Sequence, residues 1–421
     1  MIKILFKLRF NYKIHNIFVF FANWIMGEKK KYILVLLVGF LLVNSMSYAQ
    51  SAYSKFKIHS YNHKRYRSNL HIEPRIYYGF MISHHTELQL FNSHVPAFEL
   101  SLIKDTYGKQ IWEREHNYPY IGLSFFYSTL SDNPAVGQAF ALYPFITFPI
   151  LRNSNHFLGF KLGLGLGYLT KTFDPIDNYK NIAIGSNLNV AINLMFEYRL
   201  ILNESTELST GLSLIHFSNG SMATPNYGLN MPMLSFGASK RLGKANKKMN
   251  SRRPQIPIFS YKPNKIFIFN VDAGYASKNM GNVFGERFNV YTTSFSVLKY
   301  FNRISSLGLS IDFSWDGSHE ALLVKEGIID PSVITVVRPG FAPTYEIKID
   351  KLIIGLGLGF YWGGKEKSDG SIYEQLSLKY IVFNNVFAKV NLRAHAARAA
   401  FVSFGLGYRL QYDFGIKNGK Q

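Results

Sequence analysis

The chain has 421 residues, of which 47% are apolar and 16% aromatic, and its mean hydropathy is −0.01. This composition excludes an intrinsically disordered chain. The lack of cysteine excludes a disulfide scaffold, cysteine-ligated zinc, iron–sulfur clusters and thiol catalysis. The formal charge of +21 favours a polyanionic partner, either nucleic acid or an anionic membrane surface.

The first 49 residues resemble an export signal that is preceded by an extension. Basic residues Lys29–Lys31 are followed by an apolar run, Tyr32–Val43, and by a small-residue cleavage site at Ser47–Ala49. A transmembrane anchor is the alternative, but it requires about 20 apolar residues. Met26 is the better start of this signal, so we expect residues 1–49 to comprise an upstream extension and a signal peptide.

From about residue 70 onward, short runs of strand-forming residues alternate with turn-forming clusters. The first half predicts strands at 71–82, 97–104, 118–128, 139–150, 156–169, 187–201, 205–217 and 232–242. Short turns are expected at 105–109, 151–155 and 202–204, and longer loops at 129–138, 170–186 and 218–231. Such alternation is typical of an antiparallel transmembrane β-barrel of the bacterial outer membrane, with its short turns in the periplasm. A soluble β-sandwich is the alternative.

The segment 205–218 predicts which residues face the lipid. Its odd-numbered positions from Glu207 to Ser213 are polar or small, whereas three of the four even-numbered positions from Leu208 to Leu214 carry leucines. Successive side chains of a strand point to opposite faces. His216 and Ser218 are therefore expected on the lipid side, at the cell-surface end of the strand.

The sequence also resembles itself. Residues 157–168 resemble residues 351–360, with three alternating glycines in common, and residues 235–242 resemble residues 403–410. These matches predict an internal duplication, with about eight further strands in the second half. The alternating glycines are not a nucleotide-binding loop, because they lie inside a predicted strand.

Three exported segments follow from this duplication. Residues 50–242 form the first barrel half, residues 243–264 a basic, proline-containing linker, and residues 265–421 a second β-barrel repeat without a His-x-Ser motif. Two eight-stranded units and one barrel of about 14–16 strands both remain open.

His216 and Ser218 are the pair of residues that could carry catalysis. Side chains at positions i and i+2 of a strand share a face, with their backbones about 6.6 Å apart. Histidine can accept the proton that makes serine nucleophilic. A polar pair on a lipid face is costly unless it has a role. The alternative is a rim pair that is hydrogen-bonded to the loop or to lipid headgroups.

The segments His216-Phe-Ser-Asn-Gly220 and Pro225-Asn-Tyr-Gly228 resemble the signature of the lipid A 3-O-deacylase (PagL) family, whose longer relatives carry the label acyloxyacyl hydrolase. The resemblance implies an eight-stranded outer-membrane barrel that hydrolyses an ester-linked acyl chain of lipid A without a cofactor. The substrate would be lipid A or a related glycolipid of lipopolysaccharide, reached among the outer-membrane lipids.

The resemblance also implies roles for single residues. Ser218 takes the place of the nucleophile and His216 that of the general base. Asn226 takes the place of an oxyanion donor, together with the Gly228 backbone N–H. Asn230 occupies the position of the family's acid, and Asn219 of the motif is a supporting residue. Glu197, on the neighbouring strand, is another candidate acid.

Asn230 is a departure from the family pattern. Asparagine can orient an imidazole, but it carries no charge with which to stabilise an imidazolium ion. In a serine-protease triad, the comparable loss lowers kcat by about 10⁴.

Two other functions stay open, namely a porin or assembly protein with a relic motif and an esterase that acts on glycerophospholipids. Lysine and arginine near the rims can pair with lipid A phosphates, so the basic charge does not require nucleic acid. No metal is expected, because His84-His85 and the Asp316–Glu320 segment each lie in a predicted loop without a further ligand.

Overall fold

The structure is a computed structural model that describes residues 69–82, 93–130, 134–243, 266–280, 286–366, 368–396 and 398–414. The predicted leader, the predicted linker after residue 243 and the His84-His85 pair lie outside these residues. Among the described residues, no helix is both long and apolar enough to cross a membrane.

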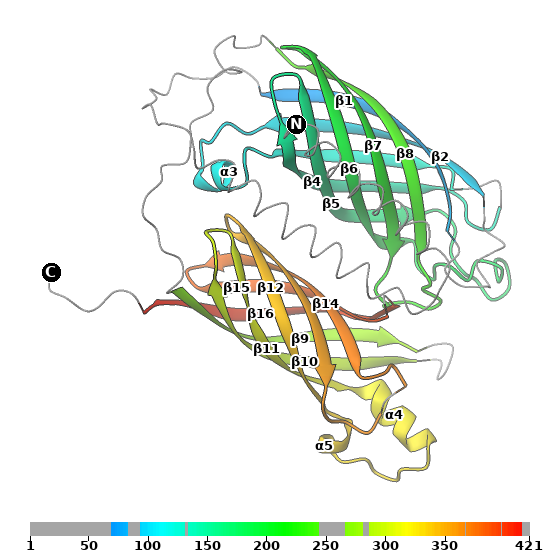
Figure 1. Ribbon diagram of the computed structural model, residues 1–421. Coiled ribbons are helices and arrows are strands. Elements are labelled where there is room, and N and C mark those ends of the chain that lie inside the picture. The colour runs from blue at the N-terminus through cyan, green and yellow to red at the C-terminus, as the bar shows by residue number, and fades with distance from the viewer. Residues whose placement is uncertain are drawn as a thin grey trace, which may run out of the picture. The chain divides into compact units, whose positions relative to one another are not determined.

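The first half of the chain forms a closed barrel of eight antiparallel strands, each paired with its neighbour in the sequence (Figure 1). The barrel closes where β1 pairs with β8, with Tyr77 opposite Ser235. The predicted strands are thereby confirmed, with bounds of β1 Leu70–Phe80, β2 His94–Asp105, β3 Tyr120–Ser128, β4 Ala139–Arg152, β5 His156–Leu169, β6 Leu188–Asn203, β7 Thr206–Ser218 and β8 Leu229–Arg241.

The short turn predicted after the second strand is wrong. The chain between β2 and β3 contains a helix, α3 (Ile111–Glu115), so this connection is as long as those of the opposite rim. The Glu113 carboxylate accepts a hydrogen bond from the Lys109 N–H at 2.8 Å, and the Thr106 hydroxyl donates one to the Pro119 carbonyl at 2.7 Å. Such local side-chain hydrogen bonds stabilise a compact loop. The turn-forming residues at 105–109 gave no indication of this longer connection.

The second half forms another closed barrel of eight antiparallel strands, in which β9 pairs with both β10 and β16. Of the two arrangements that the sequence left open, two eight-stranded units is the observed one. The elements are β9 Ile266–Asn279, β10 Arg287–Tyr300, β11 Ser305–Asp316, α4 Gly317–Lys325, α5 Val333–Val336, β12 Arg338–Ile349, β13 Leu352–Tyr361, β14 Ile372–Phe383, β15 Val386–His395 and β16 Arg398–Asp413.

The internally similar segments occupy equivalent strands. The alternating glycines lie in β5 and β13, which are the fifth strands of their barrels, and the other matching pair lies in β8 and β16, the eighth strands. A Cβ at Gly167 would lie 2.6 Å from the Phe217 ring, so the absence of a side chain leaves room for that ring. The correspondence supports the predicted duplication, and the glycines belong to strands rather than to a nucleotide-binding loop.

The two faces of β7 differ as the sequence predicts. Its odd-numbered side chains are buried, whereas Leu208 and Leu212 on the other face are 44% and 63% exposed. Large apolar side chains are exposed in the same way along the other strands. An apolar outer wall around a polar interior is the pattern of a membrane-spanning barrel.

Charged side chains fill the interior of the first barrel. Arg75 forms ion pairs with Glu73 at 2.6 Å and with Glu197 at 2.9 Å, and Lys161 pairs with Glu99 at 2.7 Å. All five side chains are almost fully buried. Eight strands enclose a space just wide enough for side chains to fill, so this interior is packed.

Candidate active site

His216 lies on the outer wall of the first barrel, near the end of β7. Its chain neighbours Ile215 and Phe217 are fully buried inside the barrel, and His216 itself is half-buried on the opposite face. The register places His216 opposite Asn230 on β8, and His216 Nδ1 lies 2.7 Å from Asn230 Oδ1. This hydrogen bond fixes the orientation of the imidazole ring.

Ser218 is the last residue of β7, and its hydroxyl belongs to a network within the β7–β8 loop. Ser218 Oγ lies 3.3 Å from Asn226 Oδ1, and it accepts hydrogen bonds from Asn226 Nδ2 at 3.1 Å and from the Gly220 backbone N–H at 3.2 Å. Asn226 Oδ1 also accepts a bond from the Asn219 N–H at 3.1 Å. Asn226 is thus held directly beside the serine oxygen.

The β5–β6 loop supports the β7–β8 loop from the side. Ile184 forms an isolated β-bridge with Asn226, and Asn219 Nδ2 donates to Ser186 Oγ at 2.9 Å. A Cβ at Gly185 would lie 2.6 Å from the Thr224 carbonyl oxygen, so only glycine allows the two backbones to come this close. Positions of the β5–β6 loop therefore help to set where Asn226 stands.

The structure corrects one proposed donor. The Gly228 backbone N–H, expected to assist the oxyanion, instead donates to the Ala183 carbonyl at 3.0 Å. The Gly220 N–H, which sequence reasoning missed, is the backbone donor that reaches the Ser218 oxygen. No motif spacing points to Gly220, because its position depends on how the loop turns after β7.

The candidate acid Glu197 does not reach His216. It is fully buried on the inner face of β6 and is paired with Arg75 and Arg199. Asn230 is therefore the residue that contacts His216 Nδ1 from the position of the family's acid.

His216 and Ser218 share the outer face but make no hydrogen bond with each other in the described structure. The Ser218 hydroxyl is engaged by Asn226 instead. Catalytic hydrogen bonds are often long or misaligned before substrate binds. The direct hydrogen bond between His216 and Ser218 that their spacing suggests therefore stays a prediction.

The described residues of the second barrel include no equivalent of this pair. His395, at the end of β15, is 6% exposed and faces the interior, where its Nε2 lies 3.3 Å from the Tyr361 hydroxyl. It precedes Ala396, and a register shift between Arg393 and Ala394 separates it from the regular strand pairing.

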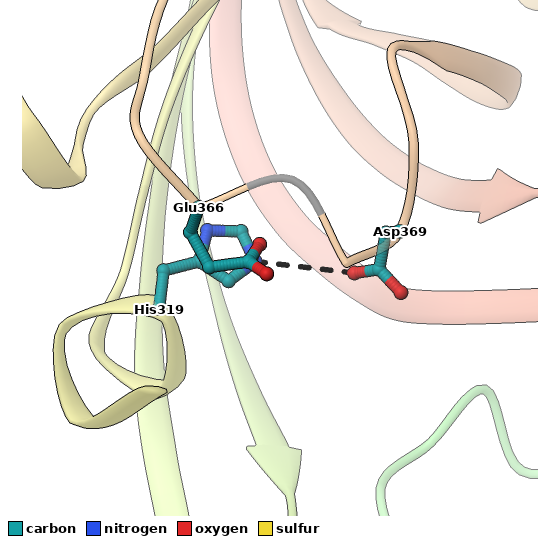
Figure 2. Close-up of side chains that lie close together, drawn as sticks. All are labelled: His319, Glu366 and Asp369. Carbon is teal, nitrogen blue, oxygen red and sulfur yellow. Dashed lines mark ion pairs between the residues drawn. The ribbon is translucent and has the colours of Figure 1, made fainter. Parts of the chain in front are cut away.

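One premise about metals is wrong. His319 was expected in a loop without a further ligand, but it lies on α4, and Glu366 and Asp369 approach it from the segment between β13 and β14 (Figure 2). Segments far apart in the sequence thus supply a group that could hold a cation.

Two family models match the chain, and together they take in nearly all strands of both barrels. The model described as lipid A 3-O-deacylase (PagL) matches residues 97–239, which contain every residue of the candidate site. The model described as acyloxyacyl hydrolase, C-terminal domain, matches residues 266–412.

The first barrel is thus similar to the PagL family, and the second to the C-terminal domain of acyloxyacyl hydrolases.

Solved structures of outer-membrane proteins are also similar to this chain. The outer membrane enzyme PagL is 16% identical, and the match covers 39% of this chain and 97% of that one with a TM-score of 0.28. Neisserial surface protein A is 9% identical, and the match covers 42% and 98% with a TM-score of 0.30. The search of curated proteins finds no match.

Proposed function

We propose that this protein is an outer-membrane esterase that hydrolyses an ester-linked acyl chain of lipid A or a related glycolipid. The observation that carries the proposal is the outward-facing His216, held by Asn230 beside Ser218 on an apolar wall. Acyl chains in the outer leaflet reach this wall directly, because the exposed leucines of β7 are part of the same surface.

His216 is the general base in this proposal. When Asn230 Oδ1 accepts the 2.7 Å bond, Nδ1 carries the proton and Nε2 keeps its lone pair. This tautomer leaves Nε2 as the proton acceptor for Ser218. The bond to Asn230 thus has the orienting role that a carboxylate has in a catalytic triad.

Ser218 is the nucleophile. Its hydroxyl turns from Asn226 to His216 Nε2, which takes the proton as Ser218 Oγ attacks the ester carbonyl carbon. The bond to the sugar oxygen then breaks, and His216 returns the proton to that oxygen. Water then attacks the acyl-enzyme while His216 takes a proton from it. His216 returns that proton to Ser218 Oγ as the fatty acid is released.

Asn226 Nδ2 and the Gly220 N–H are the proposed oxyanion donors. Both now donate to the Ser218 oxygen, at 3.1 and 3.2 Å, and both are released when the hydroxyl turns away. They would then be placed next to the carbonyl oxygen as it gains negative charge, where such donors contribute most. Lys171 and Lys180, which are exposed in the adjoining β5–β6 loop, can pair with lipid A phosphates.

The packed interior of the first barrel argues against a porin. Buried ion pairs such as Lys161–Glu99 occupy the space through which a solute would pass. An eight-stranded barrel filled in this way leaves no aqueous channel.

Mass spectrometry of lipid A from cells with and without the protein tests the proposed function. We expect the wild-type protein to remove one ester-linked acyl chain and Ser218→Ala to leave lipid A unchanged, with normal heat-modifiable migration as evidence of folding. Ser205→Ala, in the turn at the opposite rim, is the matched control and should retain full activity.

Two outcomes would contradict the proposal. Unchanged lipid A with fatty acid released from phospholipid would indicate a phospholipase, and no change in either lipid would indicate a non-enzymatic protein. Activity that persists in Ser218→Ala would exclude Ser218 as the nucleophile.

A further inference from the structure

A group of buried acidic and histidine side chains lies at one rim of the second barrel. His319 belongs to α4, directly after β11, and Asp316 is the last residue of β11. Glu366 and Asp369 come from the segment between β13 and β14. Figure 2 shows the carboxylates of Glu366 and Asp369 turned toward the His319 ring, with the ion pair to Asp369 dashed.

Three carboxylate oxygens converge on a single nitrogen. His319 Nε2 lies 3.5 Å from Asp316 Oδ2, 3.6 Å from Glu366 Oε2 and 4.0 Å from Asp369 Oδ2. An N–H···O hydrogen bond is normally about 2.7–3.2 Å long, and one N–H cannot serve three acceptors. Ligands about 2.0–2.1 Å from a tetrahedral cation lie about 3.4 Å from each other, which is close to these separations.

Each carboxylate is oriented through its other oxygen. Asp316 Oδ1 accepts from the Ser318 N–H at 2.9 Å, and Glu366 Oε1 accepts from the Ser368 N–H at 2.6 Å. Asp369 Oδ1 pairs with Arg398 Nη2 at 2.9 Å. Outer contacts of this kind hold metal-binding carboxylates in place. They leave the second oxygens of Glu366 and Asp369 for the ion, whereas Asp316 Oδ2 accepts a hydrogen bond from Lys278 Nζ.

Glu366 provides an independent indication of a missing ligand. Its side chain is 2% exposed, and its Oε2 atom has no hydrogen-bond partner although it points at His319. A buried carboxylate oxygen without a hydrogen bond is costly. A cation between Glu366 and His319 would remove this cost.

Three cations lie around the same group and oppose metal binding. Lys278 Nζ is 3.2 Å from Asp316 Oδ2, and Arg338 Nη1 is 3.8 Å from Glu366 Oε2. Together with Arg398, these cations offset the three carboxylates, so an ion-pair network without a metal is the competing interpretation. That interpretation leaves the Arg338 Nη1 and Glu366 Oε2 atoms buried without hydrogen bonds.

We propose that His319, Glu366 and Asp369 bind one divalent transition-metal ion, with Asp316 next to it. Their ligand atoms all lie within 4.8 Å of one another. A mixed imidazole and carboxylate set matches Zn²⁺, whereas Mg²⁺ and Ca²⁺ prefer oxygen ligands alone. The ion joins α4 to the β13–β14 segment, and this role is independent of the proposed esterase activity.

Zinc binding by the purified full-length protein in detergent tests this site. After dialysis against ZnCl₂ and then against zinc-free buffer, we expect about one zinc per chain by elemental analysis, as the single site implies. Glu366→Gln and His319→Gln should lower the zinc affinity at least about tenfold. Glu326→Gln, an exposed change just after α4, is the matched control and should bind as the wild type does.

Thermal unfolding of the wild type provides a second measurement in case a variant does not fold. Zinc should raise the unfolding temperature and EDTA should reverse the increase, because a ligand that binds only the folded state stabilises it. The absence of bound zinc and of a thermal shift would overturn the proposal. Equal zinc binding by Glu366→Gln and Glu326→Gln would overturn it as well.

Discussion

At the scale of single residues, the uncharged partner of His216 is the unusual feature of the candidate site. Asn230 accepts the same hydrogen bond that a carboxylate would accept, so it can fix the tautomer of the imidazole. It cannot stabilise the imidazolium that forms when Ser218 loses its proton. The proposed site is therefore oriented for catalysis but has weak electrostatic support for the charged intermediate.

Asn230→Asp is expected to raise kcat for lipid A deacylation. The reverse change in a serine-protease triad costs about 10⁴ in kcat, so an increase of at least about tenfold is expected here. The rate of acyl-chain release from purified lipid A measures it. Asn203→Asp makes the same chemical change at the opposite rim, where Asn203 Oδ1 accepts hydrogen bonds from Ser205, and should leave the rate unchanged.

A folded Asn230→Asp variant with an unchanged or lower rate would contradict the role of Asn230. It would mean that proton transfer to His216 is not limiting, or that another residue is the base.

At the scale of elements, the contact between two loops determines the position of Asn226. Ile184 of the β5–β6 loop bridges to Asn226, and Gly185 packs against the Thr224 backbone. These contacts join residues about 40 positions apart, and they are made by backbone rather than by recognisable side chains.

Gly185→Ala is expected to reduce activity without unfolding the barrel. Its Cβ would lie 2.6 Å from the Thr224 oxygen, so one backbone must move and Asn226 is displaced. A displacement near 1 Å in an active site can cost about a hundredfold in rate. Acyl-chain release and heat-modifiable migration are the measurements.

Gly357→Ala in β13 is the control for this change, because its nearest neighbour, Thr344 Oγ1, is at an ordinary distance of 3.5 Å. Full activity in a folded Gly185→Ala variant would show that the loop contact does not position the site.

The strands, and the position of His216 on the outer face of the barrel, could be predicted because both depend on the local alternation of polar and apolar residues. Glu207 and Leu208 already distinguish the inner and outer faces of β7. Three contacts could not be predicted from the sequence. They are the hydrogen bond from the Gly220 N–H to Ser218, the hydrogen bond from the Gly228 N–H to Ala183, and the proximity of His319 to Glu366. Each depends on loop conformation or on contacts between distant segments, which leave no periodic signal.

At the scale of the whole molecule, both barrels have charged interiors, although the family motif occurs only in the first. Glu346 in the second barrel pairs with Lys379 and Arg409, each at 2.7 Å, much as Glu99 pairs with Lys161 in the first. These pairs connect strands across each barrel. The candidate site therefore lies on the wall of a barrel whose strands are connected by interior ion pairs.

Lys161→Met is expected to destabilise the folded protein, because it leaves Glu99 buried without its cation. Glu99 would keep hydrogen bonds from Ser101 and Tyr77, but removing one partner of a buried pair typically costs about 3–5 kcal/mol. The midpoint of urea unfolding should fall accordingly. Lys104→Met, which changes an exposed lysine of β2, is the control and should leave the midpoint nearly unchanged.

The double variant Glu99→Gln with Lys161→Met separates a lost ion pair from a packing defect. Removing both charges should recover a large part of the stability that Lys161→Met loses, since the penalty comes from the unpaired carboxylate. If Lys161→Met is as stable as Lys104→Met, or if the double variant recovers nothing, the ion pair does not hold the first barrel. The strand pairing alone would then hold together the wall beneath His216 and Ser218.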